Sequence, residues 1–322
     1  MKILLIRSLV GFALAAVTTS ALQAADAYPA KPVRIVVSSA PGGSVDIITR
    51  MVAQKMSENL GQPVIVENRA GADTLIGIRY VKAAAPDGYT VLATSSSITT
   101  LPFFKLDTGY DLLQDFSPIG MMTRSPWVIV VGVGQPDKTL AELVARGKER
   151  PEAISFATSG LGTAPYMGAA LFLQRAGVKG LHVPYKGNGA ALPDVIGGRV
   201  TMIFQGVSVA AELIKAGQLR ALGVTSETRL SALPDVPTVA EQGMPGFSNY
   251  FFTGLLAPAG TPPDAVQRLS RSMLAATKEL HARFESEGVE TPTATPAEFL
   301  QSLKQDLDST AKLTAALDVK KE

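Results

Sequence analysis

Side chains able to do acid–base, nucleophilic or metal chemistry are scarce in this 322-residue chain. It has two histidines, His182 and His281, and no cysteine. The missing cysteine excludes thiolate catalysis, disulfides, iron–sulfur clusters and zinc–cysteine sites. The two histidines lie in a predicted strand and a predicted helix. They are too few to favour a histidine general base or a histidine-ligated metal site.

The common motifs of catalysis are also missing. There is no G-x-x-x-x-G-K-[ST] loop for nucleoside triphosphates and no G-x-S-x-G around any serine. Glycines recur in two loops, but neither matches G-x-G-x-x-G. Chemistry by carboxylates alone stays open, although no spacing argues for it. We therefore expect no enzyme, no cofactor and no metal.

The sequence offers instead a glycine-bearing loop, Ala40-Pro41-Gly42-Gly43-Ser44-Val45-Asp46. Adjacent Gly42 and Gly43 permit positive φ and close approach of a ligand to the main chain. A helix expected from Ser44 leaves the N–H groups of its first turn unpaired, and its dipole favours negative charge there. The loop is therefore either an anion-binding site formed by main-chain N–H groups or a tight turn without a ligand.

A second loop, Ser159-Gly160-Leu161-Gly162-Thr163, is the counterpart of the first. Ser159 and Thr163 supply hydroxyl donors, and Thr163 stands where it would also cap the following helix. Asp46 is the single carboxylate of the first loop. It either receives a cationic group of a ligand or stabilises the start of its own helix.

Strand-like and helix-like runs alternate from residue 33 onward, which predicts parallel strands joined by helices. The alternation breaks at residues 118–122 and 127–133, two consecutive strand candidates where we expect the chain to cross into a second α/β unit. Helices at 263–287 and 296–317 close the chain. In such sheets ligands bind beyond the carboxyl ends of the strands. The loops at those ends are rich in Gly, Ser, Thr and amide side chains and span 40–46, 68–73, 95–100, 158–163, 185–188 and 205–208.

Composition narrows the class of protein further. Hydrophobic residues make up 46% and charged residues 18% of the chain, and the net charge is +2. Without a dense Lys/Arg run we expect no nucleic-acid partner. Lys2 and Arg7 flank an apolar run that ends near Ala16, which predicts a signal peptide over residues 1–25 with cleavage within 24–27. The run is short for a membrane-spanning helix, so we expect a protein exported to the periplasm.

Several phrases of the chain resemble those of the Bug proteins, the periplasmic solute-binding receptors of tripartite tricarboxylate transporters. The resemblance covers essentially the whole mature chain. The phrases are Tyr28-Pro-Ala-Lys-Pro-Val-Arg-Ile-Val-Val, Ala40-Pro-Gly-Gly-Ser-Val-Asp46, Leu60-Gly-Gln-Pro-Val-Ile-Val-Glu-Asn-Arg69, Ala85-Pro-Asp-Gly-Tyr-Thr90, Val183-Pro-Tyr-Lys-Gly187, Ile214-Lys-Ala-Gly-Gln-Leu-Arg-Ala-Leu-Gly-Val-Thr225, Leu233-Pro-Asp-Val-Pro-Thr238 and Leu256-Ala-Pro-Ala-Gly-Thr-Pro262.

The resemblance implies a type II periplasmic-binding-protein fold, with two doubly wound α/β lobes joined by crossover strands. We expect lobe 1 to hold residues 28–122 and 227–322 and lobe 2 to hold residues 123–226. The lobes would close on a small organic acid held by loop N–H groups, hydroxyls and ordered water. Carried over residue by residue, the ligand contacts are Pro41, Gly42, Gly43, Asp46, Ser95, Ser96, Ser159, Gly162 and Thr163.

The chain departs from the family pattern in three places. Ser39 stands where many relatives have an aromatic residue, the glycine-rich stretch after Arg69 is reduced to residues 70–73, and Gln205 replaces an acidic position. Loss of that charge would accommodate a second carboxylate, or exchange an ammonium contact for an amide contact. Gln205 is therefore a candidate specificity residue, with ordinary loop chemistry as the alternative.

The leading hypothesis is a monomeric periplasmic receptor that captures an organic carboxylate and delivers it to the membrane subunits of a tripartite transporter. One alternative keeps the receptor fold but makes the partner the ectodomain of a membrane sensor. A remote alternative is a hydrolase or isomerase that uses Asp46.

Overall fold

The computed structural model describes residues 28–316 and residue 321. The signal peptide predicted at residues 1–25 lies outside the described residues. Within the described part of the chain, no helix is both long and apolar enough to cross a membrane.

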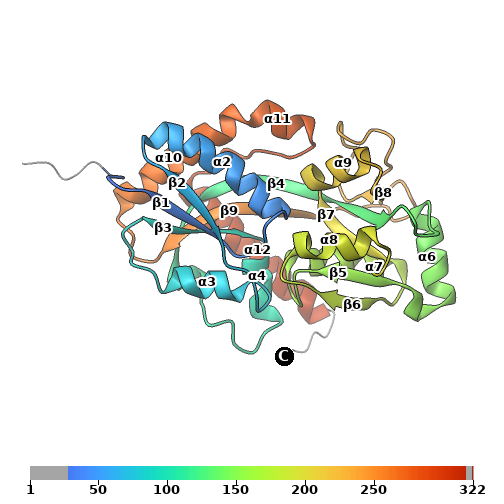
Figure 1. The fold of residues 1–322 in the computed structure, drawn as a ribbon. Helices are drawn as coiled ribbons and strands as arrows, with labels where there is room; N and C mark the ends of the chain where they lie inside the picture. The colour runs from blue at the N-terminus through green and yellow to red at the C-terminus, as the bar shows by residue number, and fades with distance from the viewer. Residues whose placement is uncertain (1–27, 317–320, 322) are drawn as a thin grey trace, which may run out of the picture.

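The first sheet has the strand order β2-β1-β3-β9-β4. β1 pairs in parallel with β2 and β3, and β9 is antiparallel to both β3 and β4. We call this sheet and its helices lobe 1 (Figure 1). Its elements are β1 (Val33–Val37), α2 (Ser44–Leu60), β2 (Val64–Asn68), α3 (Leu75–Lys82), β3 (Thr90–Ser95), α4 (Ser97–Thr100), η1 (Leu101–Phe103), α5 (Leu112–Asp115), β4 (Phe116–Gly132), β9 (Tyr250–Pro258), α10 (Pro263–Glu279), α11 (His281–Ser286) and α12 (Pro296–Ala316).

The second sheet continues from β4 in the order β4-β7-β5-β6, and β8 pairs with the opposite edge of β4. β5 is parallel to β6 and β7, whereas β4 is antiparallel to β7 and β8. We call this sheet and its helices lobe 2. Its elements are α6 (Leu140–Glu149), η2 (Pro151–Ala153), β5 (Ser155–Thr158), α7 (Ala164–Ala176), β6 (Leu181–Pro184), α8 (Asn188–Ile196), β7 (Met202–Gly206), α9 (Val207–Lys215) and β8 (Leu219–Val224).

β4 is the strand that joins the two sheets. It pairs with β9 as far as Pro126 and with β7 from Trp127 onward. The expectation of two separate strands at 118–122 and 127–133 is therefore wrong. Proline lacks the N–H that a ladder needs and is tolerated at bulges, and β4 shifts register after Pro118 and changes its partner after Pro126. The two prolines thus interrupt the sequence pattern without ending the strand.

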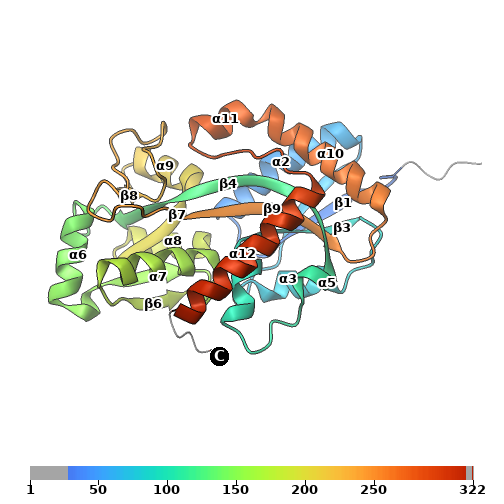
Figure 2. The same ribbon diagram turned by 180° about the vertical axis from the view of Figure 1, so that it is seen from behind.

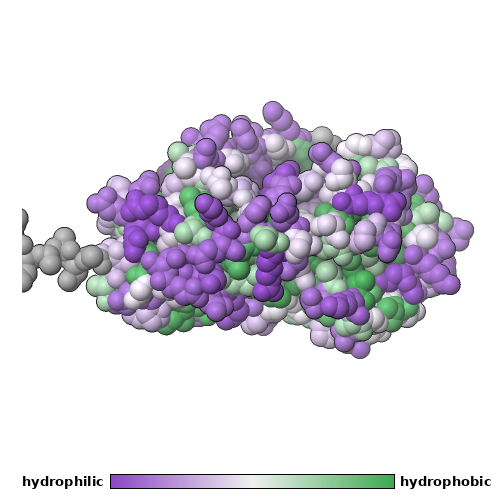
Figure 3. All heavy atoms as spheres, turned by 90° about the horizontal axis from the view of Figure 1, so that it is seen from above, coloured by the Kyte–Doolittle hydropathy of each residue, from purple (hydrophilic) through white to green (hydrophobic). Residues whose placement is uncertain are grey.

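Helices cover the faces of both sheets. α12 runs across the back of β4 and β9 (Figure 2), where the side chain of Phe299 is fully buried. The helix expected over 263–287 is divided at Leu280 (φ −88°, ψ −2°) into α10 and α11. Neither proline nor glycine marks that break in the sequence. Seen from above, the exposed face is mainly hydrophilic with scattered hydrophobic residues (Figure 3).

The boundaries proposed for the lobes, at 122/123 and 226/227, stay a prediction. The connector after β8 stays close to lobe 2, since the N–H of Val224 donates to the carbonyl of Pro237 at 3.0 Å and the N–H of Val239 donates back to Val224 at 2.9 Å.

Candidate ligand-binding site

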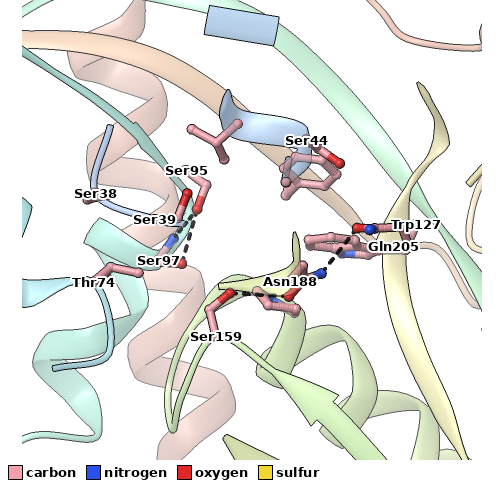
Figure 4. Close-up of a pocket in the computed structure, with 14 residues that line it drawn as sticks. Ser38, Ser39, Ser44, Thr74, Ser95, Ser97, Trp127, Ser159, Asn188 and Gln205 are labelled. Carbon is pink, nitrogen blue, oxygen red and sulfur yellow. Dashed lines mark hydrogen bonds between the residues drawn. The ribbon is translucent and has the colours of Figure 1, made fainter. Parts of the chain in front are cut away.

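A pocket lies between the two lobes, where strand ends and helix starts of both sheets meet (Figure 4). It holds about 470 Å³ of space, part of which is open to solvent. Its fourteen lining residues are all uncharged. They are Ser38, Ser39, Gly43, Ser44, Val45, Thr74, Ser95, Ser97, Trp127, Ser159, Pro165, Asn188, Gln205 and Phe251.

Helix N-termini converge on this pocket from both lobes. Ser44 and Val45 begin α2, and Thr74 immediately precedes α3. From lobe 2, Pro165 lies in the first turn of α7 and Asn188 begins α8. The N–H groups of a first helical turn have no partner within the helix, and the dipole makes this end partly positive. The pocket is therefore suited to an anion although no cationic side chain lines it.

Four buried side-chain atoms of the pocket have no hydrogen-bond partner among the described residues. They are Ser44 Oγ, Thr74 Oγ1, Trp127 Nε1 and Gln205 Nε2. Each residue is at most 7% exposed, and each of the four atoms can donate a hydrogen bond. Because an unsatisfied buried donor costs about 1–3 kcal/mol, the pocket favours a ligand that brings acceptors.

The orientation of Gln205 is fixed by its neighbours. The backbone N–H of Gly206 donates to Gln205 Oε1 at 3.1 Å, and Asn188 Nδ2 donates to the same oxygen at 3.3 Å. Asn188 is itself held by bonds to the Phe204 carbonyl (2.8 Å) and from Ser159 Oγ (3.2 Å). Since a backbone N–H can only donate, the amide atom beside Gly206 must be the oxygen. Gln205 therefore keeps Nε2 as its unused donor.

Asp46 is placed beside the pocket and does not line it. Its carboxylate is 3% exposed and accepts from Gly42 N (3.0 Å), Arg50 Nε (3.0 Å) and Asn68 Nδ2 (2.9 Å). Burial alone raises the pKa of Asp46, but the hydrogen bonds from Arg50, Gly42 and Asn68 outweigh it and hold the pKa below its usual range. The carboxylate thus stays ionised and fixes the glycine loop to α2 and β2.

The second glycine loop also uses its polar groups within the protein. Thr163 Oγ1 donates to the carbonyl of Gly160 at 2.6 Å and makes no capping bond to α7, so the expected side-chain cap is wrong. The carbonyl of Gly162 accepts from Thr100 Oγ1 of lobe 1. Ser96 Oγ accepts from the N–H of Phe252 at 3.0 Å.

The ten residues predicted for the site divide into two groups. Gly43, Ser95, Ser159 and Gln205 line the pocket, and Pro41, Gly42, Asp46, Ser96, Gly162 and Thr163 do not. Their role as ligand contacts stays a prediction.

The sequence reasoning named none of the remaining lining residues as ligand contacts, although its loops at 40–46, 95–100 and 185–188 contain Ser44, Val45, Ser97 and Asn188. Other lining residues lie outside every loop that it singled out, and they are Ser38, Thr74, Trp127, Pro165 and Phe251. Thr74 adopts φ +77°, which no glycine or asparagine signals. The rings of Trp127 and Phe251 stack at 4.0 Å between centroids, although they are 124 positions apart. The abundance of Ser, Thr and amide side chains in the strand-end loops was thus the signal for Ser44, Ser97 and Asn188.

The lobes touch each other beside the pocket. The N–H of Ala164 in lobe 2 donates to Ser97 Oγ of lobe 1 at 2.9 Å. On the other side, the N–H of Ala40 donates to the carbonyl of Lys186 at 3.1 Å. These bonds between the lobes define a closed arrangement around the pocket.

Two α/β lobes joined by crossover strands, with a polar pocket between them, define the class of two-lobed periplasmic binding proteins. The particular family follows from a match of residues 48–287 to the model of the tripartite tricarboxylate transporter family receptor. The chain belongs to this family. Its members are receptors that bind a substrate rather than enzymes, so the expectation that the chain is no enzyme is confirmed.

Three solved structures are similar over nearly the whole chain. The periplasmic binding protein BugD is 33% identical, with a TM-score of 0.88 over 92% of this chain and 100% of BugD. Rpa4515 of R. palustris, solved with adipate, is 28% identical, with a TM-score of 0.87 over 92% and 100%. MatC of Rhodopseudomonas palustris, solved with bound malate, is 27% identical, with a TM-score of 0.82 over 88% and 98%. The expected fold and Bug-type resemblance are thus confirmed.

Proposed function

We propose that this receptor binds a small organic carboxylate between its lobes in the periplasm and passes it to the membrane subunits of a tripartite transporter. The observation that carries the proposal is the set of buried, unpartnered donors in the pocket, Ser44 Oγ, Thr74 Oγ1, Trp127 Nε1 and Gln205 Nε2. A carboxylate has about four acceptor sites and matches such a set.

The electrostatics favour the same ligand class. The first turns of α2 and α8 direct their partial positive charge to the pocket. No carboxylate lines the pocket to repel an anion. Two similar receptors were solved with malate and adipate, which are both organic acids.

Binding works by closure of the lobes. Ser44 and Thr74 belong to lobe 1, whereas Trp127 and Gln205 belong to the second sheet. Only the closed arrangement brings all four donors to one ligand, so the ligand has a higher affinity for this state and shifts the population toward it.

Different observations support export and the membrane partner. Residues 1–25 have the pattern of a signal peptide, and the family is named for a transporter receptor. A sensor ectodomain is the alternative partner. Crosslinking of the ligand-loaded receptor in membranes, followed by identification of the captured protein, separates the two, because either a permease or a sensor is recovered.

Titration calorimetry with the mature chain and a panel of organic acids tests the ligand class. We expect saturable binding of one acid per chain and a higher melting temperature. Ser44→Ala should weaken binding about tenfold or more, since hydrogen bonds to charged groups contribute about 1.5–3 kcal/mol. Ser226→Ala is the matched control, because Ser226 Oγ is also buried and unpartnered but lies outside the pocket. A panel without any binding, or equal losses in both variants, would contradict the proposal.

A further inference from the structure

We propose that Trp127 and Gln205 form a donor-only subsite that restricts the receptor to amine-free organic acids with a second oxygen function. This inference rests on the proposed function, that is, on carboxylate binding in the same pocket. It names the substrate class within that function.

The two donors are fixed and available. Gln205 is fully buried, and its oxygen is used by Gly206 N–H and Asn188 Nδ2. Within the part of the chain that the structure describes, only Nε2 of the Gln205 side chain is left unpartnered. Trp127 is 4% exposed, and its Nε1 is likewise unpartnered. Both residues line the pocket, and they come from the paired strands β4 and β7, where Trp127 lies opposite Gly206, the residue after Gln205 (Figure 4).

A ligand group at this wall must accept hydrogen bonds. Indole Nε1–H is a donor only, and so is the amide Nε2 once the Gln205 oxygen is engaged. A hydroxyl, carbonyl or carboxylate oxygen satisfies both atoms. An ammonium group there meets only N–H donors, so its own N–H groups and the two protein donors are all left without acceptors, which is unfavourable for buried groups.

No negatively charged side chain of the described lining residues compensates a ligand ammonium. The nearby carboxylate of Asp46 is already bonded to Gly42, Arg50 and Asn68. The helix N-termini that favour the ligand carboxylate also repel a cation. The pocket therefore selects against amino acids.

Apolar side chains of the pocket offer a contact surface for the carbon skeleton of the ligand. The Trp127 ring stacks on Phe251, with centroids 4.0 Å apart and planes at 24°. Val45 and Pro165 add further apolar surface to the lining. The hydroxyls of Ser95 and Ser97 lie on the side of the pocket away from Trp127 and Gln205 (Figure 4). A carbon skeleton between two oxygen-bearing ends fits this arrangement.

Matched ligand pairs test the inference by calorimetry. Malate and aspartate differ in a hydroxyl against an ammonium group, and adipate and 2-aminoadipate differ in an added ammonium group. For each pair in which binding is detected, we expect the amine-free acid to bind at least about tenfold tighter than its amino counterpart. Equal or tighter binding of the amino members would overturn this inference and leave carboxylate binding intact. No binding by any of these acids or a wider acid panel would overturn the proposed function as well.

Two variants test the residues themselves. Gln205→Glu exchanges the free donor for an acceptor. We therefore expect it to bind the amine-free acid about tenfold more weakly, and its preference for the amine-free acid over the matched amino acid should narrow or invert. Gln218→Glu adds the same charge on the exposed turn after α9 and should change neither. Trp127→Phe keeps an aromatic ring but removes Nε1, and it should weaken the amine-free acid about fivefold or more while the protein stays folded. An unchanged affinity and preference in both Gln205→Glu and Trp127→Phe would refute the subsite.

Discussion

Closure of the lobes can be tested by a single added methyl group. Gly189, in the first turn of α8, faces the glycine loop of lobe 1. A Cβ at this position would lie 2.4 Å from the carbonyl oxygen of Pro41 and 2.9 Å from the backbone nitrogen of Gly43. Both are backbone atoms, so they cannot turn away as a flexible side chain would. Gly189→Ala therefore acts as a wedge between the lobes.

The size of the effect follows from these distances. A Cβ needs at least 3.0–3.4 Å, so α8 and the glycine loop must separate by roughly 0.6–1.0 Å. Such a shift strains the bond from Ala40 N to Lys186 O, now 3.1 Å, and moves Gly43 in the pocket wall. If two hydrogen bonds of about 1 kcal/mol each are lost in the closed state, the affinity falls about 30-fold.

Without ligand, Gly189→Ala should not lower the stability of the protein. Lobes that hinge can separate and relieve the contact, and alanine is favoured over glycine in a helix by up to about 1 kcal/mol. We expect the melting temperature without ligand to stay the same or rise, while the affinity for the carboxylate falls. Calorimetry and thermal melting of the same sample measure the two quantities.

Gly134→Ala is the control, because no heavy atom of the described residues, apart from its chain neighbours, lies within 4 Å of the Cβ it would add. Small-angle scattering with saturating ligand should show a larger radius of gyration for Gly189→Ala than for the control. Tight binding with normal compaction in Gly189→Ala would refute the reasoning, since the closed state would then tolerate the wedge.

Three further predictions concern closure and charge. Thr100→Val removes the bond from Thr100 Oγ1 to the Gly162 carbonyl between the lobes and should weaken ligand binding about fivefold by calorimetry, with little change in the unfolding free energy. Asp46→Asn should lower the unfolding free energy by about 2 kcal/mol at pH 7. The folded pKa of Asp46 is depressed, so this stabilisation is present above about pH 4 and is lost as pH falls through the folded pKa. Urea unfolding of both proteins from pH 3 to 7 should show that the difference in unfolding free energy between them shrinks below pH 4. Burial raises the pKa of Asp306 to about 6 against the opposing charge of Arg124. The folded protein therefore favours the protonated carboxyl, and the stability that this proton contributes is lost as pH rises through about 6. Asp306→Asn should be more stable than the wild type at pH 8 but not at pH 4.

Local patterns in the sequence predicted the elements well. α2 begins at the expected Ser44, and α12 begins at the expected Pro296. These features depend on neighbours three and four positions apart, which a sequence displays directly. The single strand β4 was not predictable in the same way, because its continuity depends on pairing with β9, more than 100 residues later.

The candidate site shows the same division. The loop containing Gly43 and the strand end at Ser95 were found from local signals, and both line the pocket. The partners of Asp46 required the fold, because Asn68 comes from the neighbouring strand β2. Arg50 stands four positions after Asp46 on the same helix, so this ion pair depends on local spacing, but it became evident only in the structure. Contacts between distant segments set the unused donors and therefore the chemistry of the pocket.

A pocket without cationic side chains gives closure a direct role in affinity. A lysine or arginine on one lobe would hold a carboxylate even when the lobes are apart, because a full charge acts over a longer range than a hydrogen bond. Here the donors are divided between Ser44 and Thr74 on one side and Trp127 and Gln205 on the other. In the open state each half returns to water, where donors gain little from a ligand. The ligand is therefore held firmly only while the lobes stay closed, and opening alone is enough to release it.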